Sequence, residues 1–287
     1  MTRPVRGAGN GAGNRNAPAG SYGADDAHHT PGSPLLLPNA WDHASAAALA
    51  ARGFAAVGTT SLGVAAAAGL PDGRAATRDA SLALARSLGG GPFHLSVDAE
   101  NGFSDDPEEV AGTARALAAA GVAGINLEDG RADGTLAPVE LHAAKIAAVK
   151  AAVPDLFVNA RTDTHWLRDG GGGGHGGTGP RETIRRLDAY RQAGADGVFV
   201  PGLSDPSRIT ALLAALDVPL NILYAPTGPP VPALADLGVG RVSLGSLLYR
   251  RALGAALETA DLIRAGRPLE GATPTYDDVQ ALTTYRR

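Results

Sequence analysis

The fold of this chain is decided by two stretches of sequence, LSVDAENGF (residues 95–103) and GINLED (residues 124–129). Each passes from apolar residues into carboxylates, as a buried parallel strand does where it surfaces at its carboxyl end. Acids at single strand ends are commonly helix caps or loop residues, but two such ends would bring a group of acids to one edge of a sheet. Clustered carboxylate oxygens on rigid strand ends suit Mg2+. The acids concerned are Asp98, Glu100, Glu128 and Asp129.

A short apolar segment alternates with an alanine-rich helical segment from residue 34 to the end of the chain. Eight alternations predict an α/β fold, the (β/α)8 TIM barrel, and a doubly wound open sheet is the alternative. Glycines such as Gly121 and Gly194 stand where helices are expected to end, and glycine there supplies a left-handed cap. Strands are expected at 35–37, 55–59, 93–97, 123–127, 156–159, 197–200, 220–223 and 241–244. Helices are expected near 42–52, 78–88, 107–120, 138–152, 181–193, 205–215, 231–237 and 246–265.

The first 33 residues consist mainly of small and polar residues and predict a disordered N-terminal tail, because they cannot repay the entropy of ordering. Residues 34–287 predict a single barrel domain with a C-terminal helical extension. The glycine-rich run at 170–177 falls between the fifth strand and its helix. It is expected to be a flexible insertion, either a mobile flap over the active face or a neutral loop.

The composition excludes several classes of function. A net charge of -4 gives no basic surface, so neither nucleic acid nor an anionic membrane is an expected partner. The absence of cysteine excludes disulfides, thiolate metal sites and a cysteine nucleophile. Lysine is confined to Lys145 and Lys150, which removes most candidates for Schiff-base chemistry. With no long apolar run and no secretory leader pattern, a cytoplasmic enzyme is expected.

The carboxyl ends of barrel strands carry the active sites of such folds. Arg161 closes the fifth expected strand, and an acid cluster with one arginine indicates a site that holds an anionic oxo-acid and stabilises an enolate oxygen. The alternative for Arg161 is a structural ion pair with Asp163 or Glu128. Small residues at 60–62 offer backbone N–H groups that could cradle a carboxylate.

Other candidates each have a structural alternative. Trp41 could serve the site or pack as an ordinary aromatic residue before a helix-capping Asp42. Asp72 could be a site acid or an exposed turn residue. The histidines at 43, 94, 142 and 165 lack the spacing of a metal triad.

Six motifs together resemble the phosphoenolpyruvate mutase/isocitrate lyase superfamily, over about residues 34–265. They keep the order and approximate spacing of the family's motifs. They are NAWD (39–42), GTTSL (58–62) with Asp72, DAENGF (98–103), NLED (126–129), NARTD (159–163) and AGADG (193–197).

The resemblance implies a (β/α)8 barrel, dependence on Mg2+ with Mn2+ as an alternative, and a small oxo-acid or hydroxy-acid substrate that passes through an enolate. It also implies a homotetramer, a dimer of dimers whose last helices swap between neighbouring barrels. By the resemblance, Asp98 is the direct metal ligand, Glu100 and Glu128 hold metal-bound waters, and Asp72 is an acid at the back of the site. The resemblance implies that the substrate carboxylate is bound by the segment Thr60, Ser61 and Leu62. The other implied substrate contacts are Trp41, Arg161 and Asn221. The implied catalytic residues are Arg161, Glu128 and Asp72.

This sequence departs from the family pattern in ways that bear on the reaction. It lacks the cysteine loop of the lyases, and the segment at 130–138 is short and lacks the Lys-Thr-Asn-Ser element of the mutases. Gly58 replaces a tryptophan, Glu100 an aspartate and Pro201 a histidine. The chain therefore resembles a divergent, short-loop group of the superfamily.

Three functions are compatible with these observations. The first is a Mg2+-dependent lyase that cleaves a C–C bond of a small di- or tricarboxylate, by retro-aldol cleavage or decarboxylation. The second is a phosphonate enzyme, a mutase or hydrolase acting on a P–C bond. The third is a catalytically silent barrel that binds a metabolite. The proton donor is left open among Tyr224, Arg131 and a metal-bound water.

Overall fold

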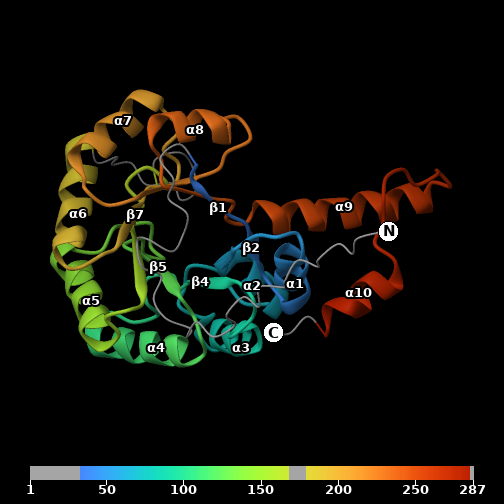
Figure 1. Ribbon diagram of the computed structural model, residues 1–287, viewed down its shortest axis with the longest axis horizontal. Helices are drawn as coiled ribbons and strands as arrows, with labels where there is room; N and C mark the ends of the chain where they lie inside the picture. Colours follow the sequence, from blue (N-terminus) through green and yellow to red (C-terminus); the bar gives the residue numbers. More distant parts are fainter. Residues whose placement is uncertain (1–32, 168–178, 285–287) are drawn as a thin grey trace, which may run out of the picture.

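A computed structural model describes residues 33–167 and 179–284, which form a barrel of parallel strands surrounded by helices (Figure 1). The strands follow the order β1-β9-β8-β7-β6-β5-β4-β3-β2 in one sheet, and every pairing is parallel. This confirms the predicted (β/α)8 architecture. The strands are β1 (Leu35–Leu37), β2 (Asn39–Ala40), β3 (Ala56–Thr59), β4 (His94–Asp98), β5 (Gly124–Glu128), β6 (Phe157–Arg161), β7 (Gly197–Phe199), β8 (Leu220–Leu223) and β9 (Arg241–Ser243).

The helices follow the strands along the outside of the barrel (Figure 1). Two of them, α4 and α7, begin with a proline in the first turn after an aspartate cap. The helices are α1 (His43–Ala51), α2 (Ser61–Ala68), α3 (Arg78–Leu88), α4 (Pro107–Ala119), α5 (Val139–Ala152), α6 (Pro180–Gln192), α7 (Pro206–Ala215), α8 (Val231–Leu237), α9 (Leu247–Arg264) and α10 (Tyr276–Leu282).

The barrel closes on residues 35–40, where Pro38 separates the expected strand β1 from β2, a two-residue strand that was not expected. β1 pairs with β9, and β2 pairs with β3. Proline has no N–H to donate to a ladder, so the strand is interrupted there. The carbonyl of Pro38 nevertheless accepts a hydrogen bond from the N–H of Gly58 at 2.8 Å. This segment therefore joins the two ends of the sheet.

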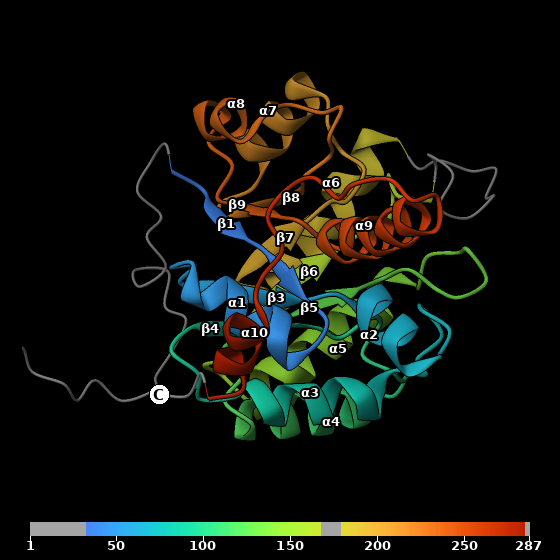
Figure 2. The same ribbon diagram turned by 90° about the vertical axis from the view of Figure 1, so that its right-hand side faces the viewer.

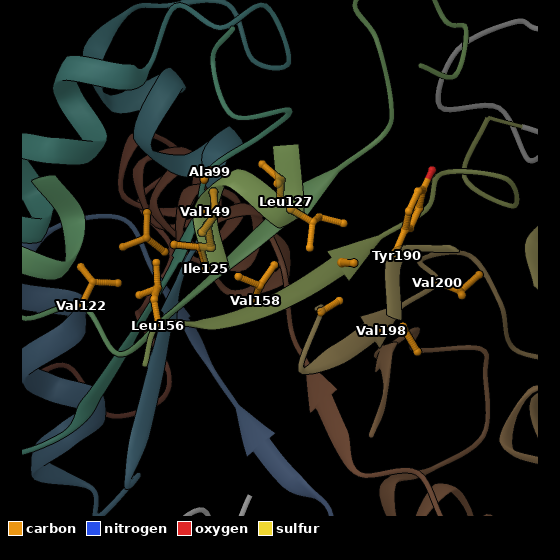
Figure 3. Packing of buried hydrophobic residues seen from close by; sticks show 14 of the residues in the cluster. Ala99, Val122, Ile125, Leu127, Val149, Leu156, Val158, Tyr190, Val198 and Val200 are labelled. Carbon is orange, nitrogen blue, oxygen red and sulfur yellow. The ribbon is translucent and has the colours of Figure 1, made fainter. Parts of the chain in front are cut away.

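Side chains in the strands alternate between the helices and the barrel interior. In β5, Ile125 and Leu127 are buried in the hydrophobic core, whereas Asn126 and Glu128 face the inside and its rim. Figure 3 shows Ile125, Val158 and Val198, from three neighbouring strands, in this core. The inward positions are largely polar, which prepares the carboxyl end of the barrel for a polar site.

One helix of the barrel was not expected. Residues 61–68 form α2, although they follow directly on a strand end, and its first two residues had been expected only in a substrate-binding segment. A further short helix, α10, lies in the C-terminal region and has a capping box at Thr275 and Asp278. Residues 1–32 of the predicted N-terminal tail and the whole glycine insertion at 170–177 lie outside the described residues.

The C-terminal helix α9 extends away from the barrel, and the chain then returns through α10 towards α1 (Figures 1 and 2). None of the residues of α9 or α10 is buried. Six of the eight exposed large hydrophobic side chains of the described residues belong to this C-terminal region: Leu253, Leu257, Ile263, Leu269, Tyr276 and Val279. No helix among the described residues combines the length and apolar character needed to cross a membrane.

Candidate functional site

A cavity of about 530 Å3 opens at the carboxyl ends of the strands. It brings together seven of the residues singled out from the sequence: Thr60, Ser61, Leu62, Asp72, Asp98, Glu128 and Arg161. Three others, Trp41, Glu100 and Asn221, do not line it. The cavity occupies the position where barrel enzymes carry out their chemistry.

Arg161 lies at the end of β6, opposite Glu128 at the end of β5. Its guanidinium forms ion pairs with the carboxylates of Glu128 and Asp163, both at 2.6 Å. The same group lies 5.7 Å from the centre of the Phe199 ring. Burial opposes the charge on Arg161, but Asp163 and Glu128 outweigh it and raise the pKa of the arginine. Both structural ion pairs considered from the sequence are present, and the arginine still lines the cavity.

Asp98 ends β4 at the mouth of the cavity, where two neighbouring groups hold it. Its backbone N–H donates to the Thr59 hydroxyl at 2.9 Å, and its Oδ2 accepts from the N–H of Ser61 at 3.2 Å. Ser61 opens α2, so Asp98 lies at the positive end of a helix. The N–H of Thr60 is also engaged, by the carbonyl of Ala40 at 3.1 Å. The N–H groups of Thr60 and Ser61, which were expected to be free for a ligand, therefore donate to Ala40 and Asp98. Leu62 lies in the first turn of α2, where N–H groups have no intrahelical partner.

Negative charge accumulates in the cavity. Burial raises the pKa of Glu128 well above its ordinary value, and repulsion from Asp163 and Asp98 raises it further, whereas Arg161 lowers it. Burial also raises the pKa of Asp72; a hydrogen bond from the Ser61 side chain opposes this, and the charge of Asp98 adds to it. Arg161 thus faces several carboxylates.

Glu100 is turned away from the cavity and is only 2% exposed. Its backbone has a φ of +47°, in the left-handed region, and its carboxylate accepts hydrogen bonds from the N–H of Ala75 at 2.9 Å and from the hydroxyl of Thr77. The carboxylate of Glu100 is therefore held behind Asp98 by Ala75 and Thr77, in the segment that precedes α3. Burial raises the pKa of Glu100, which these hydrogen bonds oppose.

Trp41 and Asn221 lie near the cavity without lining it. The Trp41 ring meets the ring of Tyr249 edge to face, with centroids 5.4 Å apart, and the following Asp42 caps α1 in a capping box with Ser45. Asn221 is 1% exposed and donates to the hydroxyl of Ser243 at 3.3 Å. Ser243 itself lines the cavity, so Asn221 contacts the site through a neighbour.

Asp129 does not join the acids of the cavity, although it follows Glu128 directly. It is fully buried, and it accepts hydrogen bonds from the Tyr190 hydroxyl at 2.7 Å and from Arg186 Nη1 at 2.9 Å. Its other carboxylate oxygen accepts from the N–H of Asp163 at 2.9 Å. Asp129 therefore fixes the backbone that carries the partner of Arg161.

Several residues that line the cavity had been given no role in the site from the sequence. Asn126 stands on β5 below Glu128, and its side-chain oxygen accepts from Asn159 at 2.9 Å and from Arg241 at 2.6 Å. Strict alternation along GINLE (124–128) would have placed Asn126 and Glu128 on one face. Asn39 and Ser243 also line the cavity, and no role had been expected of them.

The donor groups of the cavity fit a magnesium ion. Within residues 33–167 and 179–284, no three histidine or carboxylate side chains converge closely enough to ligate one metal together. Mg2+ needs only one or two carboxylates because it keeps several waters. Carboxylate oxygens are its preferred ligands, and a divalent cation would offset the burial and the repulsion between acids that raise the pKa values of Asp72 and Glu128.

Comparisons with known proteins point to one family. Residues 26–264 match the family model described as phosphoenolpyruvate phosphomutase. The chain is 45% identical over 256 residues to an uncharacterized protein of Mycobacterium tuberculosis, covering 89% of this chain and 94% of the relative.

Two solved structures resemble the chain to the same degree. The structure of 2,3-dimethylmalate lyase, a member of the phosphoenolpyruvate mutase/isocitrate lyase superfamily, has a TM-score of 0.75 and 26% identity, over 89% of this chain and 91% of that one. Phosphonopyruvate hydrolase, solved in complex with oxalate and Mg2+, also has a TM-score of 0.75 and 26% identity, over 88% and 91%. Overall similarity therefore does not separate C–C from P–C chemistry.

Proposed function

Because the chain belongs to the phosphoenolpyruvate mutase/isocitrate lyase superfamily, we propose that it is a Mg2+-dependent lyase that cleaves a C–C bond of a small 2-oxo or 2-hydroxy di- or tricarboxylate through an enolate. Members of the family are lyases or phosphomutases, so the expected enzyme is confirmed, and the hypothesis of a catalytically silent barrel is set aside. The substrate, the metal and the residue roles are our proposal.

One observation carries this proposal: Arg161 is held by ion pairs with Glu128 and Asp163 in a cavity lined by further carboxylates. A fixed guanidinium is a suitable partner for a substrate carboxylate or for an oxygen that gains negative charge. The surrounding acids suit a cation rather than a second anion. The site thus favours a substrate that bridges Arg161 and a metal.

Asp98 would hold Mg2+ directly, and Glu128 would act on the metal through water. Glu100, which does not line the cavity, would support Asp98 from behind. When bound, the ion supplies positive charge that stabilises an enolate oxygen. The first turn of α2, at Leu62, would bind the substrate carboxylate, with the hydroxyls of Thr60 and Ser61 beside it.

Glu128 and Asp72 are the proposed proton carriers of the site. The pKa of each is raised, so each takes up a proton more readily than an exposed carboxylate. Glu128 would accept the proton that leaves the substrate hydroxyl in a retro-aldol cleavage. The hydroxyl-bearing fragment then leaves as the 2-oxo acid, and the electron pair of the broken C–C bond is left on the other fragment as a carboxylate enolate. Arg161 would stabilise that negative charge, and Asp72 would supply the proton that the enolate takes up.

Oxalate, a planar dianion that resembles a pyruvate enolate, tests the proposal with the purified full-length chain. With Mg2+ and oxalate at 100 times its dissociation constant, the folded state should gain about 2.7 kcal/mol. Asp98→Asn should lose this stabilisation, whereas Asp79→Asn, which removes an exposed acid on α3, should keep it. Oxalate stabilisation that is equal with and without Mg2+, or equal in Asp98→Asn, would contradict the proposal. Release of CO2 or of a 2-oxo acid from small diacids then identifies the bond that is broken.

The phosphonate alternative is supported by the similarity to phosphonopyruvate hydrolase. The charges in the cavity disfavour it, because a phosphonate that also has a carboxylate carries more negative charge than a dicarboxylate of similar size. The described lining residues include only two cations, Arg131 and Arg161, against five acids, Asp72, Asp98, Glu128, Asp133 and Asp163. Release of phosphate from phosphonopyruvate, without cleavage of any diacid, would favour the alternative.

We also propose that the C-terminal region binds further copies of this chain, as a dimer of dimers with exchanged α9 helices. The support is the set of exposed apolar side chains on a helix that extends from its own barrel (Figure 1). Light scattering after size exclusion should give the mass of a tetramer. Leu257→Asp should lower that mass, whereas Leu70→Asp, at another exposed leucine, should not; a monomeric wild type would refute the assembly.

A further inference from the structure

The short segment after β5 is an ordered hairpin at the edge of the cavity. The N–H of Ala137 donates to the carbonyl of Asp129 at 2.8 Å, and the N–H of Arg131 donates to the carbonyl of Thr135 at 2.9 Å. Gly134 closes the turn with a bond to the carbonyl of Arg131 at 2.9 Å. The backbone at Arg131 is therefore fixed by the hairpin itself, and only the side chain has to move to reach a ligand.

The side chain of Arg131 lines the cavity and is 32% exposed. Its Nη2 donates to Oδ2 of Asp105 at 3.0 Å. Oδ1 of the same carboxylate accepts from Nζ of Lys145, also at 3.0 Å. Asp105 therefore serves two cations at once.

The two cations on Asp105 differ in their freedom. Lys145 is 1% exposed and also donates to the carbonyl of Asn101 at 3.0 Å, so it cannot leave. Asp105 is 60% exposed, so its ion pair with Arg131 is a weak surface contact. If Arg131 turns away, Asp105 keeps Lys145 and water. The ion pair with Asp105 thus keeps Arg131 beside the cavity, and breaking this pair costs little free energy.

Arg161, the second arginine of the cavity, has no such freedom. It is 15% exposed and bound to two carboxylates at 2.6 Å each. On the hairpin, Asp133 also lines the cavity, but its Oδ1 accepts from both the N–H and the hydroxyl of Thr135, at 2.9 and 2.6 Å. Arg131 is thus the cation that can exchange its partner for an incoming anion.

We propose that Arg131 is a specificity-determining residue: it leaves Asp105 to bind the second carboxylate of a dicarboxylate substrate, and it thereby selects diacids over the corresponding monoacids. This inference rests on the proposed function. A guanidinium can bind a carboxylate through two parallel hydrogen bonds, which suits it for this discrimination. The fixed Arg161 would hold the reacting end of the substrate, and Arg131 the distal end.

The test compares malate with lactate, which differ by one distal carboxylate and carry no 2-oxo group. Dissociation constants are measured by calorimetry with the full-length chain and Mg2+, and oxalate reports on the reacting end alone. Wild type should bind malate about tenfold more tightly than lactate, because a hydrogen bond to a charged group is gained. Arg131→Gln should abolish this preference and leave oxalate affinity unchanged.

Two further variants sharpen the result. Arg131→Lys keeps the charge without the planar fork and should retain part of the preference, whereas Asp105→Asn releases Arg131 and should retain all of it. Failure of oxalate to bind with Mg2+ would refute the proposed function and this inference with it. If oxalate binds, but wild type shows no preference for malate or Arg131→Gln retains it, the inference alone is overturned.

Discussion

Glu128 and Asp129 are neighbours in the chain, yet they belong to two different regions of the molecule. Glu128 ends β5, lines the cavity and pairs with Arg161 at 2.6 Å. Asp129 is buried behind the rim, where Arg186 and Tyr190 satisfy its carboxylate. The first region has more acids than cations to pair with them; the second has its acid fully paired. Carboxylates that lack matching cations indicate where a ligand binds. A buried carboxylate with all its partners, such as Asp129, instead stabilises the structure around the site.

The largest effect is expected for turnover in Glu128→Gln, which keeps a hydrogen-bonding group beside Arg161 but cannot accept a proton. The rate kcat should fall about 10²–10⁴-fold, as for the loss of a general base. Unfolding in urea should change by less than about 1 kcal/mol because Asp163 still pairs with Arg161. Glu140→Gln, at an exposed acid on α5, is the matched control. Unchanged turnover in Glu128→Gln would remove Glu128 from the chemistry.

Asp129→Ala should act on the fold instead. It leaves Arg186, whose side chain is 9% exposed, without its buried partner, and a broken buried pair costs about 3–5 kcal/mol. Urea unfolding measures this loss, and Glu128→Gln controls for removal of a charge one residue away. A loss below about 1 kcal/mol would show that the two regions do not differ as the contacts indicate.

His142 tests the buried region by pH. Burial lowers the pKa of His142 to about 4; Lys145 and Arg186 lower it further, and Asp129 opposes them. In the unfolded chain the histidine titrates near its ordinary value, so between these values the unfolded state binds more protons. Stability is therefore fully present above about pH 6.5 and falls by on the order of 3 kcal/mol as the pH falls to 4. His142→Phe should flatten this part of the profile, and His94→Gln, at an exposed histidine, should leave it unchanged.

Tyr190→Phe makes the smallest change to the buried region. It removes the hydroxyl that donates to Asp129 at 2.7 Å and keeps the ring, whose centroid lies 4.5 Å from that of His142. The expected loss is about 1.5 kcal/mol, as for one hydrogen bond to a charged acceptor. Thermal and urea unfolding measure it. A loss as large as that of Asp129→Ala would show that the tyrosine hydroxyl, rather than the ion pair between Asp129 and Arg186, stabilises this region.

The architecture of the barrel could be predicted because its signals are local and repeated. Alternating strands and helices, with glycines such as Gly121 and Gly194 at positive φ after helices, recur along the chain. Pro38 can be read from the sequence. Whether a second strand follows it depends on pairing with β3, which the local sequence does not specify. The helix α2 was missed because residues 61–68 continue an apolar run directly from β3, without a charged or polar face.

The site could be predicted only in part. Asp98, Glu128 and Arg161 reach one cavity because the carboxyl ends of parallel strands meet there. Glu100 turns away because its backbone adopts a φ of +47° and Thr77, 23 residues earlier, binds its carboxylate. Neither the dihedral angle nor a contact at that separation can be inferred from the local pattern. The roles of these residues stay predictions until the variants are measured.

The closure of the barrel at residues 35–40 has a consequence for the synthesis of the chain. The strand that closes the barrel is the first to leave the ribosome, but its partner β9 begins only at Arg241. A pairing of such long range is slow to form, and until it forms the nascent sheet presents open edges at β1 and at its latest strand. Ribosome-bound chains that end before β9 should therefore be digested rapidly by protease, and chains extended beyond Ser243 and clear of the exit tunnel should become resistant.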